Sequence, residues 1–450
     1  MNTSDLQASR YTTEVGATWA GTHSFRAGRL YLPETIAEAA AVIRLHDRIR
    51  VVGTRHSFND IADGMTMMSL QDVTPSIDLS EESRTVTVSS AVSYGVLASA
   101  LHERGWALKN MGSLPHISVA GATATGTHGS GDLNEVLGAS VAALRIIKAD
   151  GSIEEVDRTH LDFHGLVPSL GALGVITDLT LDIEAAYDVR QDVYRELPWS
   201  AVADDLDAVM AAGYSVSIFT TWDEPTISRV LVKTRVTGHA EPPEWLLGAS
   251  RIRHGDPALA ALGENRTESG GVAGPWLDRL PHFRLDATPS HGDEIQSEYF
   301  VDRRHGPAAI AAVRELAADI APHLIATEIR STAPDRLWLS MAYERPSLAI
   351  HFTWLNEPEV VVTLLPRIER ALAPFEARPH WGKAFAMSAA TIEPLYPRFH
   401  DFTRLRERWD PAGKFTNDFL DRVMGAYPRP RPSSEHDLHH QQTKGPASWA

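Results

Sequence analysis

Three short segments in the second half of the chain carry side chains that could bind and activate a hydroxylated substrate. These segments are Thr327-Glu328-Ile329-Arg330, Ala349-Ile350-His351-Phe352-Thr353-Trp354 and Arg378-Pro379-His380-Trp381-Gly382-Lys383. Residues two apart in a strand share a face, so Glu328 lies beside Arg330, and His351 lies beside Thr353. Each segment alone more often indicates a solvent-exposed face. Together they predict an acid, a guanidinium, an imidazole, a hydroxyl and an ammonium on one sheet face.

A first polar loop follows an early buried strand, in the stretch Val51-Val52-Gly53-Thr54-Arg55-His56-Ser57-Phe58-Asn59. Its two β-branched residues end the strand, and Gly53 begins a tight turn. Backbone amides exposed in such a turn are suited to a diphosphate. A phosphate loop does not need the imidazole of His56, and a strand-end turn with a surface histidine explains this stretch equally well.

A second loop is expected between Gly112 and Gly131, where nearly every residue is Gly, Ala, Ser, Thr or His. Such a run buries little apolar area, but it lets the backbone approach a large flat ligand closely. A flexible linker is the alternative, and the apolar Ile117 and Val119 with the flanking predicted strands argue against it. No GxGxxG pattern opens a helix after a strand, so the dinucleotide-binding fingerprint is absent.

The two loops, in this order and with a predicted helix near 94–104 between them, resemble the vanillyl-alcohol oxidase family of flavoproteins. The resemblance is closer to the alditol oxidases of that family and covers about Trp19 to Leu420. It implies FAD as cofactor, with the diphosphate on the first loop and His56 bonded covalently to the flavin 8α-methyl group. The cofactor-binding positions that it implies are Val51, Val52, Gly53, Thr54, Arg55, His56, Ser57, Gly112, Ser113, Ser118, Gly121, Ala122, Thr123, Ala124, Thr125, His128 and Ile176.

The same resemblance implies a polyol site in the second half of the chain. The matching substrate-binding residues are Ser113, Glu328, Arg330, Thr353 and Lys383, and the catalytic set is Glu328, Arg330, His351 and Lys383. The chemistry is consistent, because a polyol offers uncharged hydroxyls that need paired donors and acceptors. Glu328 can accept, while Arg330 and Lys383 donate and stabilise negative charge on a reduced flavin. Glu328 and His351 both remain candidates for the proton acceptor.

Gly112 suggests how the reduced cofactor would be reoxidised. In the family, a small residue at this position leaves room for oxygen beside the flavin, which implies a true oxidase that makes hydrogen peroxide. A glycine needed only for its backbone angles is the competing explanation.

The expected fold class is α+β, with a two-subdomain FAD-binding domain and an α/β substrate domain built on a mixed or antiparallel sheet. The expected boundaries are 1–185 for the FAD domain, 186–389 for the substrate (cap) domain, 390–425 for a C-terminal segment returning to the FAD domain, and 426–450 for a disordered tail. Residues 241–288 are rich in Pro, Gly and charge, so we expect a long excursion over the surface. Helices are predicted at 33–44, 94–104, 307–320 and 360–372.

Composition limits the remaining function classes. The chain has 450 residues, 43% hydrophobic and 22% charged, which suits a soluble protein of two or three domains. A net charge of −16 argues against nucleic acid, and no apolar run predicts a membrane span. The absence of cysteine excludes disulfides and thiolate chemistry. No metal site is predicted, because His160 and His164 lack a third ligand nearby.

The sequence therefore predicts an FAD-dependent alditol oxidase acting on a polyol such as xylitol or sorbitol and on O2, expected as a cytoplasmic monomer without a secretory signal. An aldonolactone oxidase or dehydrogenase of the same superfamily is the alternative. From another class, a non-catalytic flavin-binding protein or a carbohydrate-binding module also remains open.

Overall fold

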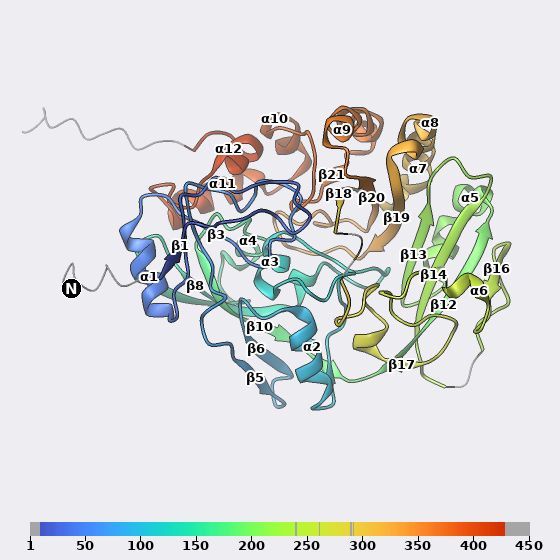
Figure 1. The fold of residues 1–450 in the computed structure, drawn as a ribbon, viewed down its shortest axis with the longest axis horizontal. Coiled ribbons are helices and arrows are strands. Elements are labelled where there is room, and N and C mark those ends of the chain that lie inside the picture. The colour runs from blue at the N-terminus through green and yellow to red at the C-terminus, as the bar shows by residue number, and fades with distance from the viewer. Residues whose placement is uncertain (1–9, 239–240, 261, 289, 291, 428–450) are drawn as a thin grey trace, which may run out of the picture.

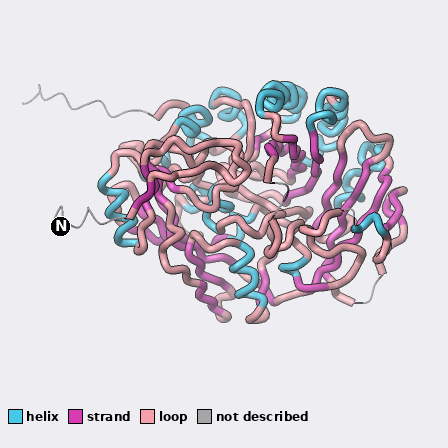
Figure 2. Tube along the Cα trace, viewed as in Figure 1, coloured by secondary structure: helices cyan, strands magenta, loops and turns pink. Residues whose placement is uncertain are grey.

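The strands of the protein gather in two groups with loops between them. The structure is a computed structural model that describes residues 10–427, apart from 239–240, 261, 289 and 291. Figure 1 shows the first half of the chain at one end of the molecule and the large second sheet at the other. Figure 2 shows that loops fill the region between the two groups of strands.

The first region contains two sheets. Four strands form one sheet in the order β1 (Tyr11–Thr12), β2 (Arg29–Tyr31), β4 (Thr66–Met68) and β3 (Arg50–Val51). Five antiparallel strands form the other in the order β5 (Ile77–Ser80), β6 (Thr85–Ser89), β10 (Val175–Asp182), β8 (Val141–Ile147) and β9 (Ile153–Asp157). A short pair, β7 (Trp106–Ala107) with β11 (Glu184–Ala185), leads into the second region.

Side-chain caps fix where the helices of this region begin. The Thr35 side chain accepts from Glu38 N at the start of α1 (Ile36–Leu45), and Ser93 accepts from Val96 N at the start of α2 (Tyr94–His102). Both caps satisfy amides that have no partner within the helix. The helices predicted at 33–44 and 94–104 are thus confirmed. The remaining short helices here are α3 (Val119–Ala124) and α4 (Phe163–Leu166).

A ten-stranded sheet organises the second region. Its strands are β12 (Asp188–Leu197), β13 (Ser215–Thr220), β14 (Ile227–Arg235), β15 (Trp245–Leu246), β16 (Ala249–Ile252), β17 (Gly274–Pro275), β18 (Glu294–Asp302), β19 (Leu324–Thr332), β20 (Ser347–Leu355) and β21 (Arg378–Pro379). The main order is β15-β16-β12-β14-β13-β19-β20-β18-β21, and β17 pairs with β12. All the pairings in this sheet are antiparallel. The α+β architecture is as predicted.

Helices line the upper side of this sheet in Figure 1. They are α5 (Trp199–Met210), α7 (Gly306–Arg314), α8 (Ala317–Ile320) and α9 (Pro358–Leu372), with the short α6 (Pro257–Ala260) near the edge strands. The helix predicted over 307–320 is divided into α7 and α8 at Leu316, where the helical register breaks. Since α9 buries Val361, Leu364, Leu365, Ile368 and Leu372, its apolar stripe faces the core.

The stretch 241–288 is largely exposed, as predicted, but it is not one long loop. Its strands β15, β16 and β17 extend the ten-stranded sheet, and Trp276 is fully buried. Thr267 and His282 are also buried. The Pro- and Gly-rich composition marks the tight turns between these short strands rather than a detached loop.

The C-terminal segment packs back on the first region, through α10 (Ala389–Ile392), α11 (Phe399–Trp409) and α12 (Asp418–Met424). The buried Arg50 donates to the carbonyls of Phe415 and Gly171, which joins the segment to the first region. Tyr427 donates to the Asp410 carbonyl, so the predicted tail is packed at this residue, and the rest of that tail, 428–450, lies outside the described residues. In the described part of the chain, no helix combines the length and apolarity needed to cross a membrane.

Candidate active site

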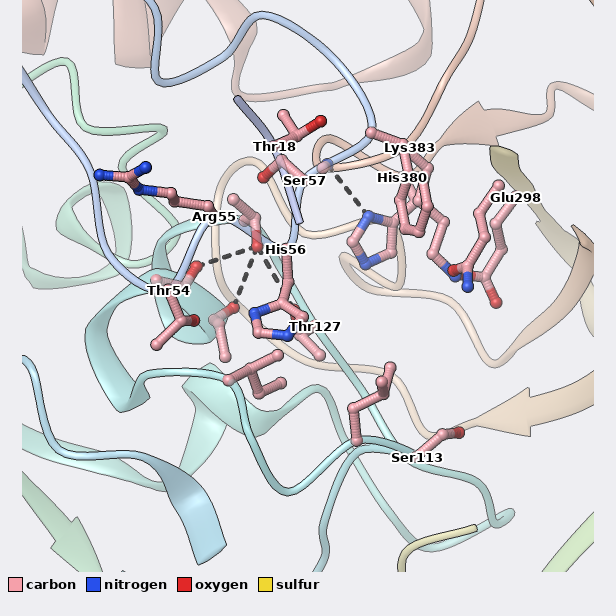
Figure 3. A pocket seen from close by; sticks show the side chains of 18 of the residues that line it. Thr18, Thr54, Arg55, His56, Ser57, Ser113, Thr127, Glu298, His380 and Lys383 are labelled. Carbon is pink, nitrogen blue, oxygen red and sulfur yellow. Dashed lines mark hydrogen bonds and ion pairs between the residues drawn. The ribbon is translucent and has the colours of Figure 1, made fainter. Parts of the chain in front are cut away.

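A cavity lies where the two polar loops of the first region meet the face of the large sheet. Its lining includes His56 from the first loop, Ser113 from the second, and Glu328 and His351 from β19 and β20. Figure 3 shows His56 between the residues of its own loop and a group formed by Glu298, His380 and Lys383. The cavity therefore joins the predicted cofactor loops to the predicted substrate residues.

The two loops touch directly at Ser118. Its backbone N–H donates to Thr54 Oγ1 over 3.1 Å, and a Cβ placed on Gly53 would lie 2.5 Å from Ser118 Oγ. A glycine at this position is thus required for close approach of the loops. Part of the second loop is helical, because Val119–Ala124 form α3 with Ser118 at the N-cap.

His56 lies in the cavity as a neutral imidazole with free nitrogens. Neither of its buried ring nitrogens has a hydrogen-bond partner in the described part of the chain. Burial is the main cause, and His116 a smaller one, of the lowering of the pKa of His56 to about 4. The Trp19 indole stacks on the imidazole with ring centroids 5.4 Å apart. The stacking orients the ring, and the neutral form keeps one nitrogen lone pair available as a nucleophile.

Glu298 is the centre of a buried ionic network on the sheet face. Its carboxylate accepts from Lys383 Nζ over 2.6 Å and from Arg330 NH2 over 3.0 Å, and His128 Nε2 lies 3.2 Å away. Burial alone would raise the pKa of Glu298, but Lys383, His128 and Arg330 hold it well below its usual value. Glu298 is therefore an anion that fixes two cations beside the cavity.

Strand register brings the acidic and imidazole groups into one row. Glu298 on β18 and Glu328 on β19 both stand directly opposite His351 on the intervening strand β20. Directly opposed residues in antiparallel strands have their side chains on the same face. The predicted shared faces of Glu328 with Arg330 and of His351 with Thr353 follow from the same pairing. Thr353 Oγ1 lies 3.4 Å from His351 Nε2.

Two residues contact the Glu328 carboxylate, and one of them, His282, lies outside its sequence motif. One carboxylate oxygen lies 2.6 Å from His282 Nε2, and Arg330 Nε is 3.6 Å from the same oxygen. Burial opposes ionisation, but Arg330 and His282 hold the pKa of Glu328 well below its usual value. An ionised Glu328 is a strong hydrogen-bond acceptor and a weak base.

His351 is also a neutral imidazole. Burial lowers its pKa well below the ordinary value, and the nearby Lys383 ammonium lowers it further. Its Nδ1 lies 3.5 Å from Lys383 Nζ. A neutral imidazole beside a cationic group can accept a proton from a hydroxyl whose charge that cation stabilises.

An anchor from the first loop positions Lys383. The Asn59 side-chain amide donates to the Trp381 and Lys383 carbonyls over 2.9 and 2.7 Å, and Phe58 N donates to the Gly382 carbonyl. Across the cavity, Arg330 NH1 donates to Ser113 Oγ over 3.2 Å. Each polar loop of the first region is thus tied to one of the two cations, Lys383 and Arg330, that line the cavity.

Three of the buried groups in the described part of the chain, His128, Glu298 and His380, have ligand atoms within 4.8 Å of one another. Lys383 and Arg330 already occupy the Glu298 carboxylate. A divalent cation here would meet two fixed positive charges, so the electrostatics oppose a metal.

Most of the residues predicted for the site line this one cavity. These are Val51, Val52, Gly53, Thr54, Arg55, His56, Ser57, Ser113, Ser118, Gly121, Ala122, Ala124, Thr125, His128, Glu328, Arg330, His351, Thr353 and Lys383. Three predicted cofactor residues do not line it: Gly112, Thr123 and Ile176 are buried behind it. Thr123 Oγ1 instead donates to the carbonyls of Val119 and Ala120 within α3.

Sequence reasoning missed several lining residues, namely Glu298, Gln296, His282, Phe219 and Arg266. Glu298 sits in a strand whose residues are nearly all buried, so no alternation marked it. His282 lies in the stretch that its composition suggested was exposed. Trp19, which the sequence did not mark as part of the site, is half-buried and stacks on His56.

Two family models match separate parts of the chain. Residues 28–157 match the FAD binding domain family, and residues 291–423 match the D-arabinono-1,4-lactone oxidase family. Among solved structures, cholesterol oxidase from B. sterolicum superposes with a TM-score of 0.76 at 12% identity, covering 93% of this chain and 98% of that one. That likeness concerns the fold.

Among characterised relatives, an alditol oxidase from a Streptomyces species is 44% identical over 406 residues, which is 89% of this chain and 97% of the relative. An L-gulono-1,4-lactone dehydrogenase from Mycobacterium tuberculosis is 29% identical over 91% of this chain and 99% of its own. An L-gulonolactone oxidase from Mus musculus is 26% identical over 90% of this chain and 97% of its own.

Proposed function

Because the chain belongs to the alditol oxidase family of FAD-binding flavoproteins, we propose that it oxidises a terminal hydroxyl of an alditol to the aldose and reduces O2 to hydrogen peroxide. Xylitol and sorbitol are the expected substrates. One observation supports this most strongly: a single cavity joins the His56 loop to a face where Glu328, Arg330 and Lys383 supply an acceptor and two cations.

The residues of the cavity fit FAD. The first loop offers backbone amides after Gly53, and the absence of a side chain at Gly53 lets the Ser118 hydroxyl of the second loop pack directly against it. His56 has unpartnered ring nitrogens in the cavity, which a ligand atom can satisfy. Bound FAD would supply the hydride acceptor and pass electrons to O2.

We also propose that His56 carries the flavin covalently, through the 8α-methyl group. The neutral imidazole that Trp19 orients supports this link. If the link exists, acid-precipitated wild-type protein stays yellow, while the His56→Ala protein releases its flavin into the supernatant. Release of all flavin from the wild-type protein would disprove the link and leave the oxidase proposal standing.

The protein side chains have distinct roles in the proposed reaction. Glu328 accepts hydrogen bonds from substrate hydroxyls, and Ser113 and Thr353 orient the chain of the polyol. Arg330 and Lys383 stabilise negative charge on the reacting oxygen, because Glu298 fixes both beside the cavity. His351 accepts the hydroxyl proton, since its Nδ1 lies 3.5 Å from Lys383 Nζ, the cation that stabilises the resulting negative charge.

Anaerobic mixing of the purified yellow protein with xylitol tests this proposal. We expect the visible flavin spectrum to bleach and to return when air is admitted. An unchanged spectrum with xylitol and sorbitol would contradict the proposal and favour a flavin-binding protein without this activity.

Aldonolactone oxidation is the second candidate function. The match of residues 291–423 to the D-arabinono-1,4-lactone oxidase family favours it. A lactone also carries hydroxyls for Glu328, and the two candidates differ in whether open-chain substrates react. We further propose that the enzyme acts as a cytoplasmic monomer.

A further inference from the structure

A buried lysine stands behind the acidic residue of the proposed substrate site. Lys233, on β14, is 1% exposed, and its ammonium makes no ion pair with a carboxylate in the described part of the chain. Its three donors instead meet the carbonyls of Leu280 and Pro281, at 2.5 and 3.2 Å, and His282 Nδ1 at 3.2 Å. Burying a charged lysine without a carboxylate partner costs folding free energy, so we expect Lys233 to have a role in the site.

The tautomer of His282 follows from the charge of Lys233. Burial lowers the pKa of Lys233 to about 7, so its side chain is an ammonium below that pH. An ammonium can only donate, so His282 Nδ1 then accepts from Lys233. The ring proton is then on Nε2, which lies 2.6 Å from a Glu328 oxygen and donates to it. Lys233, His282 and Glu328 therefore form one directed chain of hydrogen bonds.

This chain occupies only one of the two Glu328 oxygens. His282 Nε2 and Arg330 Nε both approach Oε1, at 2.6 and 3.6 Å. In the described residues, Glu328 Oε2 accepts no hydrogen bond, and Glu328 lines the cavity. The free oxygen is available to a ligand hydroxyl.

We propose that Lys233 and His282 are positioning residues that orient Glu328 and keep its second oxygen available as the acceptor for polyol hydroxyls. This inference rests on the proposed alditol oxidase function and adds to it the residues that set substrate affinity. His282 comes from the stretch 241–288, so that stretch contributes a residue to the proposed substrate site.

The charges around His282 support a neutral ring. Lys233 approaches from β14, Glu328 and Arg330 from β19, and Arg229 and Arg266 line the small space beside the ring. Burial and the Lys233 charge, opposed by Glu328, lower the pKa of His282 to about 4. Without the Lys233 charge, His282 would take up a proton more readily, form an ion pair with Glu328 and weaken it as an acceptor.

Variants at His282 test the orientation of Glu328. His282→Leu removes the donor, whereas His282→Gln places an amide N–H where Nε2–H stood. With xylitol, we expect His282→Leu to raise KM about tenfold or more with kcat changed less than about threefold, and His282→Gln to restore KM. An unchanged KM in a His282→Leu protein that retains its flavin and thermal midpoint would overturn the inference.

The Lys233→Met variant provides a second test that does not depend on how His282→Leu folds. We expect kcat/KM for xylitol to lose activity on the acid side of about pH 6.5, where the wild-type profile stays flat. Lys414→Met is the matched control, because Lys414 Nζ also donates to two carbonyls, those of Ile43 and His46, away from Glu328. A wild-type pH profile in Lys233→Met, or the same acid loss in Lys414→Met, would overturn the inference.

The wild-type protein separates this inference from the function on which it rests. Failure of the wild-type enzyme to oxidise any alditol would overturn both. Normal wild-type alditol oxidation with unaltered variants would overturn only the roles of Lys233 and His282.

Discussion

At the scale of single residues, the site depends on two glutamates with different surroundings. Glu298 contacts Lys383, Arg330 and His128, so cationic groups of the protein itself balance its charge. Glu328 has one oxygen bound by His282 and one available to the cavity. The first therefore holds the two cations in place, and the second is the proposed acceptor for substrate hydroxyls.

Replacing Glu298 with Gln should damage both activity and stability. The change leaves Lys383 and Arg330 buried without their shared anion, which costs about 3 kcal/mol of unfolding free energy. We expect kcat/KM for xylitol to fall about 100-fold. Glu369→Gln is the matched control, because Glu369 accepts from Tyr299 and Ala386 without pairing a cation. Denaturant unfolding and steady-state kinetics that match the control would refute this role of Glu298.

Gly112 allows a separate prediction about oxygen. Its φ is not in the left-handed region, and a Cβ there would meet only ordinary contacts, at 3.5 Å from Thr127 and 3.6 Å from Ile117. Backbone angles therefore do not require glycine. We expect Gly112→Ala and Gly112→Pro to slow reoxidation of the reduced enzyme by O2 about tenfold or more, with flavin reduction by xylitol changed much less. Full oxygen reactivity in Gly112→Pro would refute oxygen access as the role of this glycine.

The sequence predicted which residues carry reactive groups better than it predicted which residues those groups contact. Alternation placed Glu328 with Arg330 and His351 with Thr353, because pairing on a strand is local. Glu298 and His282 were missed because their roles arise from contacts 32 and 46 residues away in the chain, with Arg330 and Glu328. Local pattern does not contain such pairings.

At the scale of elements, the first loop has two functions. It presents His56 to the cavity, and through Asn59 it holds the turn that carries Lys383. The contact links a loop of the first region to a turn that follows β21 in the second. Correct placement of the cation therefore depends on the cofactor loop.

Asn59→Ala should loosen this turn. We expect kcat for xylitol to fall about tenfold or more, because a small displacement of a catalytic cation is costly. The control is Asn265→Ala, since Asn265 also donates through its amide to two carbonyls, those of Thr288 and Ser290. Steady-state kinetics in which both variants match the wild type would show that the turn holds Lys383 without Asn59.

Prediction of the elements was accurate where caps and periodicity agree, as at α1 and α2. It was inaccurate for 241–288, where short strands with Pro and Gly between them have the composition of a loop. They are recognised as strands only through their pairing, β16 and β17 with β12 and β15 with β16. Edge strands of two to four residues are too short for a pattern of alternation to mark.

At the scale of the whole molecule, several histidines are buried in the neutral form. Burial lowers the pKa of His128, His282, His351 and His380. As pH falls below about 6.5, the unfolded chain binds protons that the folded state does not, so unfolding becomes easier. Each histidine can contribute up to about 1.4 kcal/mol per pH unit.

The protein should therefore lose thermal stability between about pH 6.5 and pH 5. Glu298 and Glu328 do not cause this loss, because their stabilising effect persists until pH falls through their lowered pKa values. The trend also opposes the relief of charge repulsion as the protein approaches its pI of about 5.6. Thermal midpoints measured at pH 7.5 and pH 5 should differ by more than about 5 °C, and equal midpoints would contradict the assignment of neutral histidines.

The central claim is tested most directly by initial rates of peroxide release from the purified yellow protein. Xylitol, sorbitol, galactono-1,4-lactone and gulono-1,4-lactone are compared in parallel at air saturation. The account predicts peroxide equal to the alditol consumed, with kcat/KM for the better alditol at least about tenfold above that for either lactone. Peroxide from the lactones alone, or flavin bleaching by alditols without peroxide, would contradict it.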